Sequence, residues 1–138
     1  MFTPESRAFL TETARTGKIA TVRADGRPHV VPIWYYLDGD TIVFTTWHTT
    51  VKAANIRRDP RVSICVDDEA PPYAFALVDG IADTSDDLDQ LVKYATLIAA
   101  RYMGPDLAEA YGKRNGVAGE YLVRVTPTKV IYKESIAD

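Results

Sequence analysis

The sequence has very little cysteine and histidine. Cys65 is the only cysteine among 138 residues, which excludes a disulfide within the chain and a cysteine-based metal cluster. A lone cysteine is also typical of a reducing compartment, so we expect a cytoplasmic protein. The two histidines, His29 and His48, are too few to hold a metal ion without further clustered ligands. The sequence therefore predicts no metal site.

Long apolar runs and an excess of basic residues are absent as well. No segment approaches the roughly 20 apolar residues that cross a bilayer, and residues 1–5 lack the basic start and apolar stretch of a signal peptide. The 16 Lys and Arg residues against 19 Asp and Glu give a net charge of −3. Nucleic-acid binding favours a basic face. We expect neither a membrane nor a nucleic-acid partner.

Recognisable catalytic motifs are missing too. The sequence contains no Gly-rich dinucleotide turn, no P-loop and no nucleophile–base signature. If the protein is an enzyme, its chemistry belongs to a bound cofactor rather than to its side chains. No catalytic residue is assigned from the sequence.

Short apolar segments separated by tight turns dominate the chain, which is long enough for one domain, residues 1–138. Such a meander is typical of an antiparallel β-barrel, here with helices inserted between strands, a mainly β (α+β) fold. Strands are predicted at 18–23, 29–37, 41–46, 61–66, 73–83 and 120–133, the last being one strand or a pair broken at Pro127. Helices are predicted from 4 to about 16, at about 50–58, from 86 to about 102 after a Ser85 cap, and at 106–113.

The predicted strand at 29–37 is apolar or aromatic on both faces over residues 30–36. A half-exposed antiparallel strand alternates apolar with polar residues, so the outer face of this strand needs a cover. Pro32 cannot donate to a ladder, which places the strand at an edge or a bulge. Residues 73–78 repeat the two-faced pattern. A ligand ring, a second protomer or both could supply the cover, and homodimerisation is the simplest explanation.

A hydroxyl-rich turn joins the strand at 41–46 to the next helix. Strand, polar turn and helix N-terminus form the usual layout of a phosphate site. Lys52 falls in the first helical turn, where the helix dipole disfavours a cation unless an anion is bound there. The alternative is an ordinary helix cap, made by Thr49 or Thr50, beside a solvated lysine.

Segments spread over nearly the whole chain resemble a known family. Residues 25–34, 44–46 with 50–62, and 119–130 resemble the split β-barrel flavin-binding proteins related to pyridoxamine 5′-phosphate oxidase. Within that superfamily the chain is most similar to the actinobacterial deazaflavin-dependent branch, which uses coenzyme F420. The similarity to this branch rests on residues 55–62, on 66–69 with 71–73, and on 99–104.

The resemblance implies a homodimer with two cofactor sites at its interface. The phosphate-binding turn of the family corresponds to Thr49, Thr50, Val51 and Lys52. The flavin or deazaflavin ring would lie along one strand and beside another, and aromatic residues of the other protomer would close its pocket. The residues implied for the ring are Val31, Pro32, Ile33, Trp34, Thr45 and Thr46, with Tyr73 and Phe75 from the other protomer.

The function implied is an oxidoreductase in which reduced coenzyme F420 gives a hydride to an unsaturated small-molecule substrate. Val51 stands where oxidase relatives carry an arginine beside the phosphate lysine, and this less basic turn favours the deazaflavin over FMN. Two alternatives stay open. One is an FMN-dependent oxidase or reductase of the pyridoxamine-phosphate-oxidase type, and the other is a non-catalytic protein that binds a flavin or deazaflavin.

Overall fold

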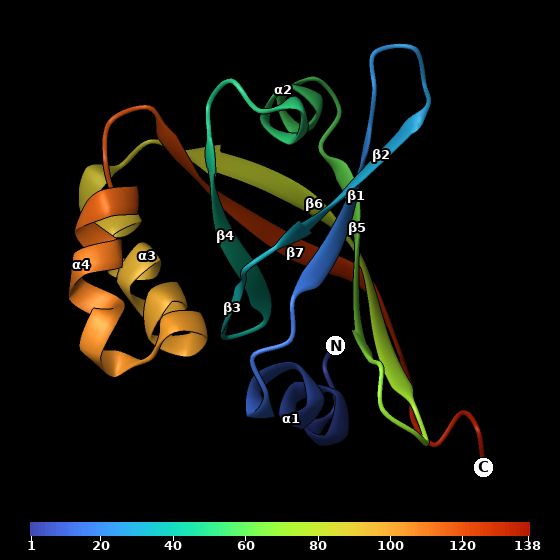
Figure 1. Ribbon diagram of the computed structural model, residues 1–138. Helices are drawn as coiled ribbons and strands as arrows, with labels where there is room; N and C mark the ends of the chain where they lie inside the picture. Colours follow the sequence, from blue (N-terminus) through green and yellow to red (C-terminus); the bar gives the residue numbers. More distant parts are fainter.

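The computed structural model describes all 138 residues and contains one seven-stranded antiparallel sheet with the strand order β2-β1-β5-β6-β7-β4-β3. Figure 1 shows this sheet with four helices around it. The predicted antiparallel β fold with inserted helices is confirmed. The strands are β1 (Gly17–Val22), β2 (Pro28–Ile33), β3 (Tyr36–Asp38), β4 (Thr41–Trp47), β5 (Arg61–Asp68), β6 (Ala74–Ser85) and β7 (Glu120–Lys133).

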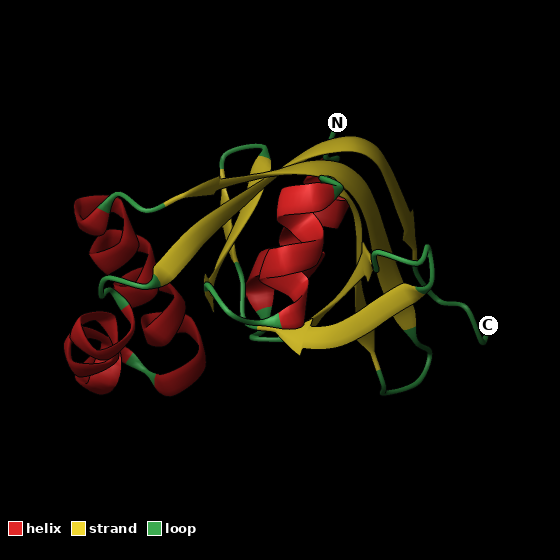
Figure 2. Ribbon diagram, turned by 90° about the horizontal axis from the view of Figure 1, so that it is seen from above, coloured by secondary structure: helices red, strands yellow, loops and turns green.

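The helices occupy three places around the sheet. They are α1 (Pro4–Glu12), α2 (Val51–Arg58), α3 (Leu88–Met103) and α4 (Pro105–Asn115). Seen from above, α2 lies over one end of the curled sheet, while α3 and α4 pack together at one side (Figure 1 and Figure 2). None of the helices combines the length and the apolar character that a membrane crossing requires.

The barrel is split between β2 and β3, which are neighbours in the chain but form the two opposite edges of the sheet. The prediction of one strand over 29–37 is therefore wrong. Tyr35 is fully buried, and its hydroxyl donates to the carbonyl oxygen of Leu10 at 2.7 Å. This anchor turns the chain inward between the two strands. Pro32, which has no N–H, lies on an edge strand as predicted.

Two apolar clusters hold the fold together. The larger one, of 16 buried residues, fills the barrel and includes Phe44 of β4. The smaller one lies between α3 and the other side of the sheet and includes Val43. Because successive side chains of a strand point to opposite faces, β4 contributes to both clusters. Each such fully buried side chain stabilises the fold by about 1.5–3 kcal/mol.

Helix α1 ends at Glu12 rather than near residue 16, and its C-cap Thr13 is already extended. The guanidinium of Arg101, from the last turn of α3, donates to the carbonyl oxygens of Leu10, Thr11 and Thr13. These bonds satisfy carbonyl groups that a longer helix would have paired within itself. The residues that follow run extended into β1.

Two further boundaries differ from the sequence expectation. Helix α3 is capped by Asp87, whose carboxylate accepts from the Gln90 N–H at 3.1 Å, whereas Ser85 ends β6. Strand β7 passes through Pro127 without a break. Pro127 lies opposite Gly80, next to a register shift in β6, and this irregularity absorbs the missing N–H. Of the two possibilities left open at Pro127, the single strand is confirmed.

Candidate functional site

A pocket of about 320 Å³ opens between the two barrel edges, the start of α2 and the side of α3. It collects residues from four separate stretches of the chain. Of the residues predicted for the cofactor site, those that line it are Pro32, Ile33, Trp34, Thr45, Thr46, Thr50 and Lys52.

The start of α2 is built by two threonine hydroxyl groups. Thr50 is the N-cap, and its hydroxyl oxygen accepts from the Ala53 N–H at 3.2 Å. The same hydroxyl donates to the carbonyl oxygen of Trp47 at 3.0 Å and lies 2.8 Å from the hydroxyl of Thr46, which is buried. These contacts hold the turn after β4 in one geometry and turn the N-terminus of α2 toward the pocket.

Helix α2 is itself fixed to the sheet by a buried polar contact. The Asn55 side-chain amide donates to the Thr21 hydroxyl at 3.0 Å. Arg58, in the last turn, donates to the Asn55 side-chain oxygen at 3.0 Å and to the carbonyl oxygen of Val22 at 2.5 Å. The contacts to Thr21 and Val22 both join α2 to β1. They give α2, and with it its first turn, a defined position at the pocket.

Lys52 is the second residue of α2 and the only cation that lines the pocket. It is half-buried and forms no ion pair and no side-chain hydrogen bond with the protein. Burial lowers the pKa of its ammonium group, and the charge of nearby Glu120 opposes that shift only in part. The helix dipole also disfavours a cation here. Lys52 is thus a poorly compensated positive charge at the N-terminus of α2.

The other end of the pocket is aromatic. Trp34 stacks face to face on Tyr102, with ring centroids 5.0 Å apart and planes 4° from parallel. On the α2 side of the pocket, Trp47 packs over Gly119, where a Cβ atom would lie 2.3 Å from the indole ring. Gly119 also has φ +100°, so both the space and the backbone require glycine there. Each indole is 40% exposed, which leaves apolar ring surface at the pocket mouth.

A pocket that combines an unpaired lysine with exposed aromatic rings occurs here in a chain with a clear family match. The sequence profile of pyridoxamine 5′-phosphate oxidase covers residues 2–134. The chain belongs to the pyridoxamine 5′-phosphate oxidase family. The resemblance predicted from the sequence is confirmed, and the family includes oxidoreductases.

Solved structures of similar proteins add an F420-dependent branch to this family. An F420 reductase is 32% identical, has a TM-score of 0.75, and the match covers 94% of this chain and 98% of that one. A conserved hypothetical protein of Mycobacterium tuberculosis has a TM-score of 0.84 at 24% identity, covering 98% and 86% of the two chains. A FAD-binding protein of Mesorhizobium loti has a TM-score of 0.66 at 22% identity, covering 94% and 90%. The last two share the fold.

Six residues of this family member line the pocket without having been predicted for it. Trp47 extends the strand that carries Thr45 and Thr46. Ala95, Ile98 and Ala99 come from α3, Asn115 ends α4, and Glu120 begins β7. The three α3 residues follow a helical spacing that indicates a buried face but not what it faces. Glu120 follows Gly119 in a segment that resembles the family, and this resemblance was the only feature of the sequence that could have indicated a place in the pocket.

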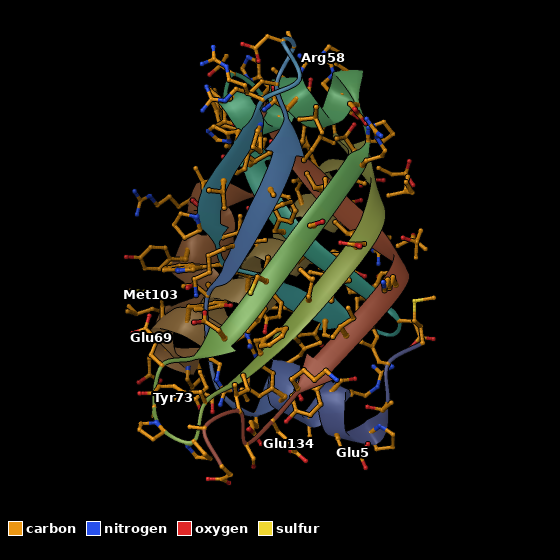
Figure 3. The ribbon with its side chains drawn as sticks, turned by 90° about the vertical axis from the view of Figure 1, so that its right-hand side faces the viewer. Glu5, Arg58, Glu69, Tyr73, Met103 and Glu134 are labelled. Carbon is orange, nitrogen blue, oxygen red and sulfur yellow. The ribbon has the colours of Figure 1, made fainter.

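Five predicted residues lie outside the pocket. Val31 packs against the barrel core, because alternation along β2 turns it away from Pro32. Thr49 and Val51 are exposed at the turn. Tyr73 and Phe75 lie at the start of β6, and Figure 3 shows Tyr73 at the opposite end of the sheet from Arg58 of α2. Their contribution from a second protomer stays a prediction.

Proposed function

We propose that the protein is an oxidoreductase that binds reduced coenzyme F420 and delivers a hydride to an unsaturated small-molecule substrate. The observation that carries this proposal is Lys52, a half-buried cation without a protein partner at the start of α2, in a pocket with an aromatic far end. The 32% identity to an F420 reductase over 94% of the chain supports the choice of cofactor.

The phosphate group fits the α2 end of the pocket. Lys52 supplies a charge-assisted hydrogen bond, which is about twice as strong as a neutral one. The first amides of α2 have no acceptor within the helix and favour an anion at this position. Thr50 already uses its hydroxyl to cap the helix, so its role is to hold the turn in shape.

The ring fits the aromatic end. Pro32, Ile33 and Trp34 provide a flat apolar bed, and Trp47 and Ile98 keep water from its sides. The bound reduced coenzyme supplies the hydride. The one acidic side chain that lines the pocket, Glu120, lies on the side of the phosphate turn, and both indoles are partly exposed, so solvent at the pocket mouth delivers the proton.

We also propose that the protein works as a homodimer in the cytoplasm, without a nucleic-acid or membrane partner. The outer face of β1, β5, β6 and β7 has no helix in front of it (Figure 3). The pairing register aligns a mostly apolar row across it, and a hollow of about 560 Å³ lies beside that row. A second copy would cover this face and bring its Tyr73 and Phe75 toward the ring. The row runs Pro32, Lys18, Cys65, Leu77 and Ile131.

A flavin enzyme is the second candidate, because one structural neighbour binds FAD. The absorption spectrum of the purified protein, followed by titrations with coenzyme F420 and FMN, separates the two. We expect saturable binding of F420 and weaker binding of FMN. Tight FMN binding without F420 binding would overturn the proposal. Reduced F420 is then mixed with a panel of unsaturated compounds, and binding without turnover of any of them would favour a non-catalytic carrier.

A further inference from the structure

Glu120 is the only carboxylate that lines the pocket, and the fold holds it in place. It begins β7 and pairs with Trp47 at the end of β4. The residue before it is fixed as well, because the backbone N–H and the ring Nδ1 of His48 both lie 2.9 Å from the carbonyl oxygen of Gly119. The Glu120 backbone is therefore a rigid part of the pocket wall on the side of the phosphate turn.

Glu120 and Lys52 share this pocket but do not form a direct ion pair. Their charges still act on each other, since Glu120 opposes the lowering of the Lys52 pKa and Lys52 opposes the raising of the Glu120 pKa. In both residues, burial is the dominant cause of the pKa shift. The His48 ring is a further neighbour that opposes the raising of the Glu120 pKa. The Glu120 carboxylate thus lies close enough to Lys52 for its negative charge to act on the proposed anion site, although the two side chains form no direct ion pair.

Among the groups that line the pocket, the charges add up to a small positive value. Lys52 contributes one positive charge, Glu120 one negative charge, and the N-terminus of α2 about half a positive charge. A ligand group with a single negative charge matches this sum, whereas a doubly charged group exceeds it. A phosphate monoester carries nearly two negative charges once its second pKa near 6 is passed, and a phosphate diester carries one.

We propose that Glu120 is a specificity-determining residue that disfavours ligands with a phosphate monoester, such as FMN, relative to ligands joined through a phosphate diester, such as coenzyme F420. The inference rests on the proposed function, because it takes the α2 end of the pocket as the phosphate site. It assigns the discrimination to repulsion between the Glu120 carboxylate and the second charge of the monoester.

The test uses three probes that share one ring and differ in charge. They are the ribityl compound without phosphate, its 4′,5′-cyclic phosphate, which is a diester, and its 5′-phosphate, which is a monoester. The series is prepared on both the flavin and the deazaflavin ring. Dissociation constants are measured at pH 8 from ring fluorescence, for the wild-type protein, Glu120→Gln and the control Glu109→Gln. Glu109 lies on α4 with an 82% exposed side chain and is remote from the pocket.

We expect Glu120→Gln to strengthen binding of the monoester about tenfold and of the diester about threefold, because the repulsion scales with the charge of the ligand. Binding of the ribityl compound without phosphate and all binding by Glu109→Gln should stay at wild-type values. Equal gains for all three probes, or no gain for the monoester, would overturn the role of Glu120 while leaving the proposed function standing. If no probe of either ring binds the wild-type protein or either variant, the proposed function itself fails, and the inference fails with it.

Discussion

Arg101 and Lys52 are two half-buried cations with opposite surroundings. The terminal nitrogens of Arg101 donate to three backbone carbonyl groups at the end of α1, at 2.8 to 3.0 Å, and to the hydroxyl of Tyr35 at 3.2 Å. Lys52, at the pocket, has neither a carbonyl nor a carboxylate partner. One cation is part of the scaffold, and the other is left available.

The difference teaches how to separate a structural charge from a binding charge in this fold. A buried charge without partners is unfavourable, so a residue that serves only the fold is surrounded by acceptors. Lys52 instead carries its desolvation penalty in the free protein, and the phosphate group that we propose for this site would relieve it. Sites of this kind are stabilised by their ligand and destabilise the free protein, the usual trade-off between function and stability.

The largest effect is expected where the scaffold cation is removed. Arg101→Leu removes the hydrogen bonds to three carbonyl oxygens and to the Tyr35 hydroxyl, and should lower the free energy of unfolding by about 2–4 kcal/mol. Urea denaturation followed by circular dichroism measures the loss. The control is Arg27→Leu, whose side chain is 80% exposed and pairs only with Asp25 in a turn. It should change stability by less than about 1 kcal/mol. Equal losses for the two variants would remove the contrast with Lys52.

Gly119→Ala tests whether the position of Trp47 at the pocket requires a glycine at residue 119. The added Cβ would lie 2.3 Å from the Trp47 indole at a backbone φ of +100°. We expect a stability loss of about 2–4 kcal/mol from strain and overpacking, with a shift in tryptophan emission. Gly26→Ala is the matched control, because Gly26 has φ +88° but no atom within 4 Å of the added Cβ. A loss in Gly119→Ala no larger than in the control would show that Trp47 moves freely.

Tyr102→Phe probes the contact between the scaffold and the aromatic end of the pocket. The Tyr102 hydroxyl donates to the carbonyl oxygen of Arg15 at 2.7 Å and accepts from the N–H of Tyr35 at 3.3 Å. Its loss should lower stability by about 1–2 kcal/mol, measured by thermal unfolding, while the stack under Trp34 is kept. Tyr111→Phe, which removes a hydroxyl without a protein partner, should change little. A destabilisation of Tyr111→Phe equal to that of Tyr102→Phe would argue against this role.

The smallest effect is expected at Lys52 and has the opposite sign. The pKa of Lys52 is lowered from its ordinary 10.5, so the folded protein binds this proton less tightly than the unfolded chain does. Lys52→Met should therefore unfold at the same or a slightly higher urea concentration at pH 7. The difference should shrink as pH rises above the folded-state pKa and the wild-type lysine loses its charge. A Lys52→Met protein that is clearly less stable at pH 7 would mean that Lys52 serves the fold.

The sequence was a good guide where the signal was local. The lysine in a first helical turn, the hydroxyl-rich turn before it and the proline in an apolar strand led to Lys52, Thr50 and Pro32, all of which line the pocket. Pro32 also marked the edge strand.

The remaining features depend on contacts between distant parts of the chain. Nothing in the apolar run around Tyr35 indicates that its hydroxyl reaches α1 and splits the strand. The sequence of α3 predicts an apolar face but does not show whether this face packs only against the barrel or also lines a pocket. Glu120 reads as an ordinary charged strand end until the fold brings it beside Lys52. These positions are set by the packing of separate elements, which local patterns do not encode.

The most direct test of the central claim is a titration of the wild-type protein and of Lys52→Ala with coenzyme F420, followed by the emission of Trp34 and Trp47, the only two tryptophans. Losing a charged hydrogen bond is worth about 1.5–3 kcal/mol, so the dissociation constant should rise about 10- to 150-fold. Arg57→Ala, on the same helix but bonded to Tyr121 outside the pocket, should bind as the wild type does. The same dissociation constant for Lys52→Ala and the wild type would contradict the account.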